Sequence, residues 1–248
     1  IYDYKPEMTS SFEAGSEWQF LRGRLGFDLT YYKTRTKNQL LLIGAPSASL
    51  YDQRYINAGL IQNSGIEIVA NLVPVRTNKF SWNLSMNYAK NVNKVIEITE
   101  EMKSVIIGGG GNLANVKVVE GLAYGVIYVK AWAKDSQGRN LVNDNGSPIL
   151  TPGLDLNVGN YNPKYKLGIS NTFQYDRLSL SFLIDYSNGG IVISSTMPFL
   201  DADGLTKRTL EGRENGLILD AVTATGGKNT QNISAETFWS AVGDRYPT

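Results

Sequence analysis

The sequence predicts an all-β fold: part of an antiparallel transmembrane β-barrel, with about six strands arranged as three hairpins. Three observations predict it. Apolar and polar residues alternate with a period of two, the alternating stretches are long, and the connections between them are alternately very short and very long. A barrel strand alternates lipid-facing apolar residues with lumen-facing polar residues, so the hydropathy averages out. The slightly negative mean hydropathy of the chain is therefore compatible with a membrane barrel.

The first hairpin is predicted near residues 9–20 and 25–36. The alternate positions from Phe12 to Phe20 are mainly apolar, with Ser16 as the exception, and the positions between them hold polar residues or glycine. Such alternation is the sequence signature of a strand with two unlike faces. A brief turn around Gly23 then reverses the chain.

The second hairpin is predicted near residues 65–73 and 80–90, and the third near 167–175 and 178–186. The strand from Phe80 has the cleanest alternation in the chain. The strand near 167–175 is less regular, because Asn171 falls in its apolar register.

The connections between the hairpins are predicted to be long loops, near residues 37–64, 91–166 and 187–248. Structureless loops beyond about 15 residues are unusual in compact domains. Outer-membrane barrels have short periplasmic turns and long extracellular loops, so this asymmetry favours a barrel. We expect residues 1–248 to form one partial barrel domain.

Strand length and aromatic placement agree with this interpretation. A tilted barrel strand needs about 9–11 residues to cross a bilayer, whereas strands of soluble proteins are mostly about five or six residues long. Aromatic residues gather near both ends of the predicted strands, as expected for the girdles of a membrane barrel. The expected lipid-facing girdle residues are Trp18, Phe20, Tyr31, Phe80, Trp82, Tyr88, Phe173, Tyr175, Phe182 and Tyr186.

Composition excludes several kinds of function. The chain has no cysteine and no histidine, which removes thiolate metal sites, disulfides and the usual catalytic triads. Its net charge of +1 gives no field that would attract nucleic acid. No apolar run approaches the roughly 20 residues of a membrane helix.

No catalytic residue, metal ligand or cofactor is expected. The acidic turns at 135–138, 144–146 and 201–204 fit hairpin loops better than calcium sites. Glu211 and Glu214 have no surrounding pattern of a glycosidase cleft, and the glycine run 108–111 lacks the lysine of a phosphate loop.

Exposed aromatic residues in the predicted loops are the candidates for ligand binding. Aromatic faces stack on sugar rings, and recognition commonly resides in loops on a rigid scaffold. Packing between loops, or against a partner protein, remains an alternative for each of them. The candidates are Tyr51, Tyr55, Trp132, Tyr161, Phe199 and Trp239.

Three stretches, residues 5–41, 56–98 and 159–190, resemble the SusC/RagA family of TonB-linked outer-membrane proteins of Bacteroidota, and residues 121–132 resemble one of its loop strands. The resemblance implies a plugged barrel of about 22 strands that imports large nutrients, glycans or oligopeptides, through the outer membrane. It also implies a SusD-like surface lipoprotein as a lid and the TonB complex as the energy source. The chain is then expected to be one piece of a longer transporter, because six strands do not close such a barrel.

A soluble β-sandwich is the competing prediction, with a role as a cell-surface glycan-binding module or adhesin. The two differ in what covers the apolar faces. In a barrel, residues such as Trp82 and Phe182 contact lipid, whereas in a sandwich they pack against a second sheet.

Overall fold

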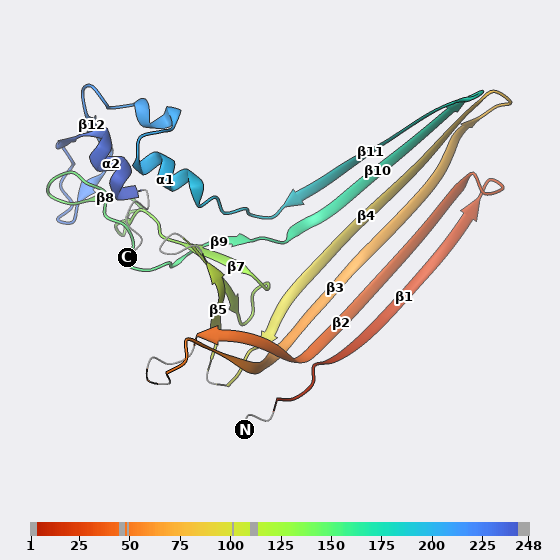
Figure 1. The fold of residues 1–248 in the computed structure, drawn as a ribbon, viewed down its shortest axis with the longest axis horizontal. Helices are drawn as coiled ribbons and strands as arrows, with labels where there is room; N and C mark the ends of the chain where they lie inside the picture. The colour runs from red at the N-terminus through yellow and green to blue at the C-terminus, as the bar shows by residue number, and fades with distance from the viewer. Residues whose placement is uncertain (1–3, 45–47, 49, 101, 110–113, 243–248) are drawn as a thin grey trace. The chain divides into compact units, whose positions relative to one another are not determined.

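The computed structural model describes residues 4–44, 48, 50–100, 102–109 and 114–242. Its main feature is a six-stranded antiparallel sheet with the order β1-β2-β3-β4-β10-β11 (Figure 1). The strands are β1 (Met8–Phe20), β2 (Leu25–Gly44), β3 (Gln53–Arg76), β4 (Phe80–Glu97), β10 (Pro163–Tyr175) and β11 (Leu178–Gly189). The predicted set of three hairpins, all antiparallel, is therefore present.

Short turns join the strands of each hairpin at one end of the sheet (Figure 1). Leu21, Arg22 and Asp176 adopt positive φ angles of 55°, 57° and 51°. Tight hairpin turns favour such left-handed backbone, because its twist matches that of the flanking strands. Two backbone bonds link neighbouring hairpins at this end: the Val73 N–H donates to the Arg24 carbonyl, and the Asp176 N–H donates to the Lys79 carbonyl, both at 2.8 Å.

The strands extend beyond their predicted bounds, and the prediction of a loop at 37–64 is wrong over most of its length. Strand β2 continues to Gly44 and β3 begins at Gln53, with Leu41 opposite Ile56. Asn38, at φ 58°, interrupts the ladder without ending it. These extensions persist because one side of them is buried, in a core made of Leu41, Ile43, Ala58, Val95, Ile98, Val105 and Val118.

The predicted loop at 91–166 also contains regular structure. Strand β4 runs to Glu97 and β10 begins at Pro163. The strands between them are β5 (Ser104–Gly109), β6 (Ala114–Val119), β7 (Val126–Val129), β8 (Leu141–Val142) and β9 (Leu156–Asn160). Gly108 and Gly109 of the glycine run end β5, and Gly110 and Gly111 lie outside the described residues.

The chain divides into two compact units, and the single partial barrel domain expected over residues 1–248 stays a prediction. The first unit contains the six-stranded sheet and comprises residues 1–107, 118–126 and 160–191. The second comprises residues 108–117, 127–159 and 192–248.

The second unit is built from short elements around its own core, in which Ile127 and Val142 are 1% and 0% exposed. A bridge between Val142 and Pro148 closes a hairpin around the acidic turn at 144–146, as predicted, and a second bridge joins Trp132 to Leu150. The other elements are α1 (Thr196–Ala202), the 3₁₀-helix η2 (Lys207–Leu210), β12 (Leu217–Ile218), β13 (Val222–Thr223), β14 (Asn232–Ile233) and α2 (Ala235–Val242). None of the described helices is long and apolar enough to cross a lipid bilayer.

Candidate ligand-binding site

The two faces of the six-stranded sheet differ in chemistry, as the alternation predicts. On β11, the apolar register includes Leu180, Phe182 and Ile184, which are all exposed. On the opposite face, polar residues pair across the strands: Glu17 lies opposite Asp28, and the Ser85 hydroxyl donates to Asn71 Oδ1 at 2.8 Å. Within the described residues, no second sheet covers the exposed apolar side chains. This counts against a soluble sandwich.

Aromatic residues of the apolar face form two groups. Near the short turns, Phe173 stacks with Phe80, Trp82 and Phe182, at centroid distances of 6.4, 5.4 and 6.1 Å. Toward the other end, Tyr165 lies 5.6 Å from Tyr88 and 6.1 Å from Tyr186. The remaining residues predicted for the girdles are exposed: Trp18, Phe20, Tyr31 and Tyr175. Contact of these ten residues with lipid stays a prediction.

The irregular Asn171 has a structural explanation. Its side chain lies in the apolar register and is buried, and its Oδ1 accepts a 3.1 Å hydrogen bond from the Trp82 indole Nε1. A buried amide oxygen without a donor would be costly, so the indole makes this polar residue tolerable on an apolar face.

A cluster of uncharged polar residues occupies the opposite face, where the sheet extends away from the short turns. Asn63 of β3 lies opposite Asn93 of β4, and Asn63 Oδ1 accepts hydrogen bonds from the amides of Asn93 at 2.9 Å and Asn91 at 3.0 Å. Asn91 Oδ1 in turn accepts a 3.2 Å bond from the Tyr32 hydroxyl of β2. Three neighbouring strands are thus connected through side chains.

Gly65 makes the contact between Tyr32 and Asn91 possible. It occupies the β3 position between these two residues, and a Cβ added there would lie 2.5 Å from Tyr32 ring atoms and from the Lys90 carbonyl. Because glycine has no Cβ, the Tyr32 ring can lie across β3 and reach β4.

The segments 118–126 and 160–191 of the first unit complete the cluster. The Tyr124 N–H donates to Asn93 Oδ1 at 2.7 Å, and the Asn162 amide donates to the Tyr124 carbonyl at 3.0 Å. Burial raises the pKa of Tyr124 and of Tyr161, so both phenols stay neutral and keep their donor hydrogen near neutral pH. Gly125, at φ 80°, admits the Tyr161 ring, which a Cβ would meet at 2.0 Å.

This cluster, together with its loop residues, lines a cavity of about 280 Å³, here called the amide pocket. None of its lining residues carries a charge. Gln39 contributes a buried Oε1 that has no hydrogen-bond partner among the described residues. The lining residues are Thr36, Gln39, Ile61, Asn63, Asn91, Asn93, Tyr124, Tyr161 and Asn162.

A second cavity, of about 410 Å³, shares Asn91, Asn93 and Asn162 with the amide pocket. It lies where the β4–β10 ladder ends, at the pairing of Ala89 with Lys166. Lys90, Lys164 and Lys166 are among its lining residues. Neutral hydrogen-bonding groups thus continue into a more basic region.

The six predicted ligand-binding aromatics are divided between the two units. Tyr51, Tyr55 and Tyr161 belong to the first unit, and only Tyr161 lines the amide pocket. In the second unit, the Trp132 Nε1 donates to the Leu141 carbonyl at 2.6 Å, and the rings of Trp132 and Trp239 lie 6.0 and 5.0 Å from Phe238. Phe199 lies half-exposed on α1. Contact of these aromatics with a ligand stays a prediction.

The residues that sequence reasoning missed are chiefly the asparagines of the amide pocket. Asparagine is depleted in strands. Its recurrence in the polar register of β3 and β4, at Asn63, Asn91 and Asn93, was a signal available in the sequence.

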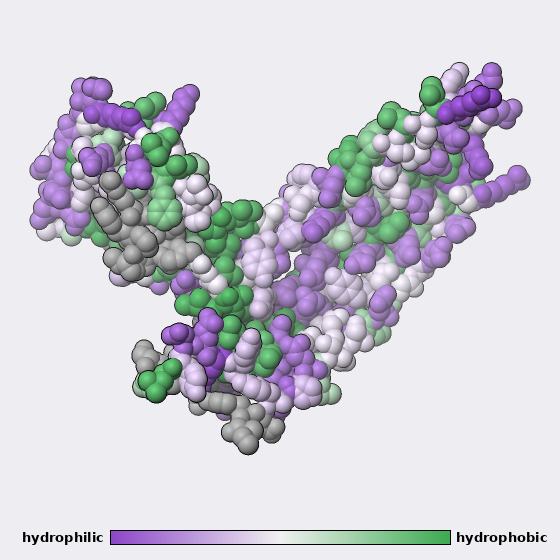
Figure 2. Space-filling model, viewed as in Figure 1, coloured by the Kyte–Doolittle hydropathy of each residue, from purple (hydrophilic) through white to green (hydrophobic). Residues whose placement is uncertain are grey.

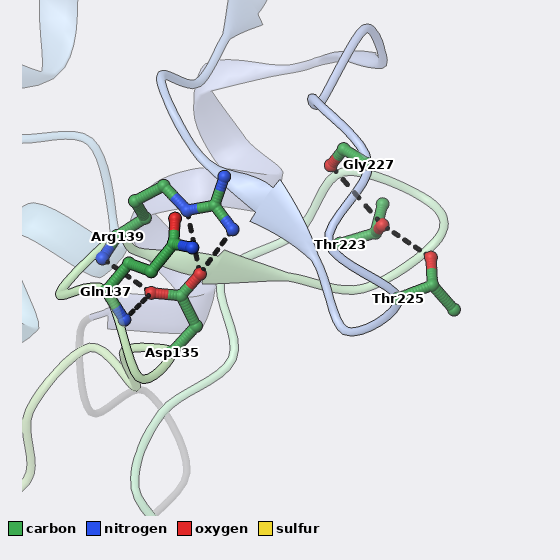
Figure 3. A network of polar contacts seen from close by, with 6 residues as sticks. All are labelled: Asp135, Gln137, Arg139, Thr223, Thr225 and Gly227. Carbon is green, nitrogen blue, oxygen red and sulfur yellow. Dashed lines mark hydrogen bonds and ion pairs between the residues drawn. The ribbon is translucent and has the colours of Figure 1, made fainter.

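Acidic residues of the second unit serve local structure. Asp201 accepts a 2.7 Å bond from Arg208 Nε and lines a cavity of about 610 Å³ with Trp239. The Trp239 Nε1 is buried and has no partner in the part of the chain that the structure describes. Asp135 accepts bonds from the backbone of Gln137 and Arg139, at 2.9 Å each, and from Arg139 Nε at 2.7 Å (Figure 3). Thr223 and Thr225 share a 2.9 Å bond in a nearby turn (Figure 3). Among the residues described, no group of three or more acidic side chains is placed to hold a metal ion.

The wall of long antiparallel strands, apolar on one face and polar on the other, with short turns at one end, is a portion of a transmembrane β-barrel. Residues 2–206 match the family described as "TonB dependent receptor-like, beta-barrel", and the chain belongs to this family.

Individual relatives agree with this assignment. The chain is 26% identical over 190 residues to the TonB-dependent receptor SusC of Bacteroides thetaiotaomicron. The aligned region covers 72% of this chain and 19% of SusC. It is 23% identical over 209 residues to a TonB-dependent receptor of Formosa agariphila, and the aligned region covers 77% of this chain and 21% of that receptor. The RagAB peptide transporter has the same fold, with a TM-score of 0.66 at 18% identity over 93% of this chain and 27% of that one. The chain thus spans about a fifth of the length of these curated relatives.

Proposed function

We propose that this chain forms part of the barrel wall of a TonB-dependent importer in the outer membrane, which takes up large nutrients, glycans or oligopeptides. The family match over residues 2–206 carries the proposal. In the whole transporter, a SusD-like lipoprotein would close over the long-loop side, and the TonB complex would supply the energy. The relatives named SusC and RagAB support this assembly.

The amide pocket is the part of this chain that we propose contacts the nutrient. It lies on the polar face of the sheet, which faces the lumen in a barrel. Side-chain amides both donate and accept hydrogen bonds, so Asn63, Asn91 and Asn93 suit ligands rich in hydroxyl or amide groups. The faces of Tyr124 and Tyr161 add aromatic surface of the kind that covers sugar rings and peptide side chains. The absence of charge from the lining favours a neutral portion of the ligand.

The test is nutrient uptake by the full-length transporter in its own host. Strains with and without the transporter gene would be grown on single oligosaccharides and on oligopeptide mixtures as sole carbon source. We expect loss of growth on one nutrient class, and restoration by the wild-type gene. Normal growth of the deletion strain on every nutrient would contradict the import function.

A variant then tests the site. Asn91→Ala with Asn93→Ala should reduce uptake of that nutrient, because it removes two of the three bridging amides. Lys130→Gln, at an exposed position of the second unit, serves as a control outside the pocket. Unchanged uptake at normal transporter abundance would remove the amide pocket from the transport path while leaving the import function standing.

A further inference from the structure

The short turns of the sheet carry a concentration of positive charge. Five cations belong to the three turns and their flanks, and all five are exposed. The turns contain one acidic residue, Asp176. We call these cations the turn belt: Arg22, Arg24, Arg76, Lys79 and Arg177.

Two features hold the turn belt together as one surface. The backbone bonds from Val73 to Arg24 and from Asp176 to Lys79 tie each turn to its neighbour. Adjacent strands lie about 4.8 Å apart, so six strands place the three turns within about 24 Å. Hydrophilic side chains gather at this end of the sheet (Figure 2).

Acidic side chains of the described residues do not neutralise these five cations. Arg24 donates to the Val73 and Pro74 carbonyls, at 3.0 and 3.2 Å, and so orders its turn. No ion pair forms at any of the five cations within the residues described. Glu17 and Asp28, the nearest acids along the first hairpin, lie opposite each other on the polar face.

The apolar face begins directly beside the turn belt. Trp18, Phe20 and Tyr175 are exposed there, within a few residues of the turns. Aromatic residues in such positions mark the level of the lipid headgroups, and basic residues at that level attract anionic lipids. Short turns of outer-membrane barrels face the periplasm, so the adjoining leaflet is the inner, periplasmic one.

We infer that the turn belt is a binding surface for anionic phospholipid headgroups of the periplasmic leaflet. Phosphate oxygens would accept bonds from the free guanidinium groups of Arg22, Arg76 and Arg177, which suit phosphate geometry. The acyl chains would lie along the aromatic residues of the apolar face. The inference concerns how the barrel sits in its membrane and does not depend on which nutrient is imported.

Native mass spectrometry of the purified full-length transporter tests this inference. The delipidated protein in neutral detergent would be titrated with phosphatidylglycerol and, separately, with zwitterionic phosphatidylethanolamine. We expect phosphatidylglycerol to bind at lower concentration, with binding that weakens as salt increases. Equal binding of the two lipids would overturn the inference.

Charge-neutral variants locate the surface. Each basic residue near an anionic lipid surface strengthens binding by a similar free energy. We therefore expect phosphatidylglycerol binding to weaken by about 100-fold in the triple variant Arg22→Gln, Arg76→Gln and Arg177→Gln. The matched control removes three charges from the second unit, as Lys130→Gln, Lys134→Gln and Lys207→Gln, and should leave binding unchanged.

Two further results would also overturn the inference: wild-type affinity in the turn variant, or the same loss in the control. If the triple variant does not assemble, Arg22→Gln and Arg177→Gln as single variants should each weaken binding several-fold. Unchanged binding in both would again contradict the inference.

Discussion

The six-stranded sheet and the second unit place their apolar residues in opposite ways. The sheet exposes Phe182 and Ile184 along one face, whereas the second unit encloses Ile127 and Val142 almost completely. Burial of apolar surface away from water stabilises both, but the covering medium differs. The second unit supplies its own cover, and we expect lipid to cover the apolar face of the sheet. One chain therefore combines a unit that buries its apolar side chains inside the protein with a sheet whose apolar face is suited to lipid.

The largest effect should come from a charge placed on the apolar face. Ile184→Arg should destabilise the assembled barrel by about 2–4 kcal/mol, the cost of a cation near the bilayer midplane. Its neighbour Leu183 is a matched control, because it is 65% exposed against 52% for Ile184 and projects from the opposite face. Leu183→Arg should cost little. Urea unfolding of the full-length transporter in lipid bilayers gives both values.

Equal costs for Ile184→Arg and Leu183→Arg would break the comparison, since they would mean that lipid does not cover one face selectively.

A smaller effect is expected where the sheet becomes part of the amide pocket. Gly65→Ala would force the Tyr32 ring and the β4 backbone apart, which should cost about 1–3 kcal/mol and lower nutrient uptake. Gly26→Ala is the control, because a Cβ there meets nothing closer than the Trp18 carbonyl at 3.8 Å. Thermal unfolding and uptake assays on the same variants separate stability from transport. Wild-type behaviour of Gly65→Ala would show that the Tyr32 contact is dispensable.

The hydrogen bond from the Trp82 indole to Asn171 Oδ1 should contribute about 1 kcal/mol to the free energy of unfolding. Trp82→Phe removes the donor and leaves Asn171 Oδ1 without its partner. Adding Asn171→Leu should recover much of the loss, because it replaces the stranded amide with an apolar side chain. A double-mutant cycle of unfolding free energies measures the coupling. Additive effects of the two substitutions would exclude the bond as the reason that Asn171 is tolerated.

The smallest effect is expected in the second unit, at Asp135. The bond from the Arg139 backbone N–H, together with the Arg139 side chain and the Gln137 N–H, lowers the pKa of this carboxyl. Its stabilisation is present above the ordinary pKa of an aspartate and is lost as pH falls through the lowered value. Asp135→Asn should therefore loosen residues 135–139 at neutral pH and not in acid.

Limited proteolysis follows this change, with trypsin at pH 7 and pepsin in acid. Cleavage elsewhere in the transporter should not change. A variant that is cut more readily at both pH values would contradict a role for the ionised carboxylate.

The sequence predicts the strands of the six-stranded sheet better than the elements of the second unit. The hairpins of the sheet were predicted because each strand repeats one local pattern, as from Phe80 to Tyr88. The extensions of β2 and β3 were missed, since Lys37, Asn38 and Gln39 interrupt the alternation. A core contributed partly by Val105 and Val118 keeps these extensions regular. The strands of the second unit are too short to show a pattern of alternating apolar and polar residues, since β8, β12, β13 and β14 each contain two residues.

Of the residues that line the amide pocket, the sequence predicts a ligand-binding role for Tyr161 alone. Its asparagines and tyrosines are ordinary when taken singly, and their significance comes from contacts between distant positions.

The sequence by itself determined the class of fold, because a period of two over long stretches sorts side chains onto two faces whatever the neighbouring strands are. It also determined the position of the short turns and their charge. Only the tertiary structure decided which residues meet. Tyr32 and Asn91 are 59 residues apart, and Trp82 and Asn171 are 89 apart. Such pairs depend on strand order and register, which local alternation does not specify.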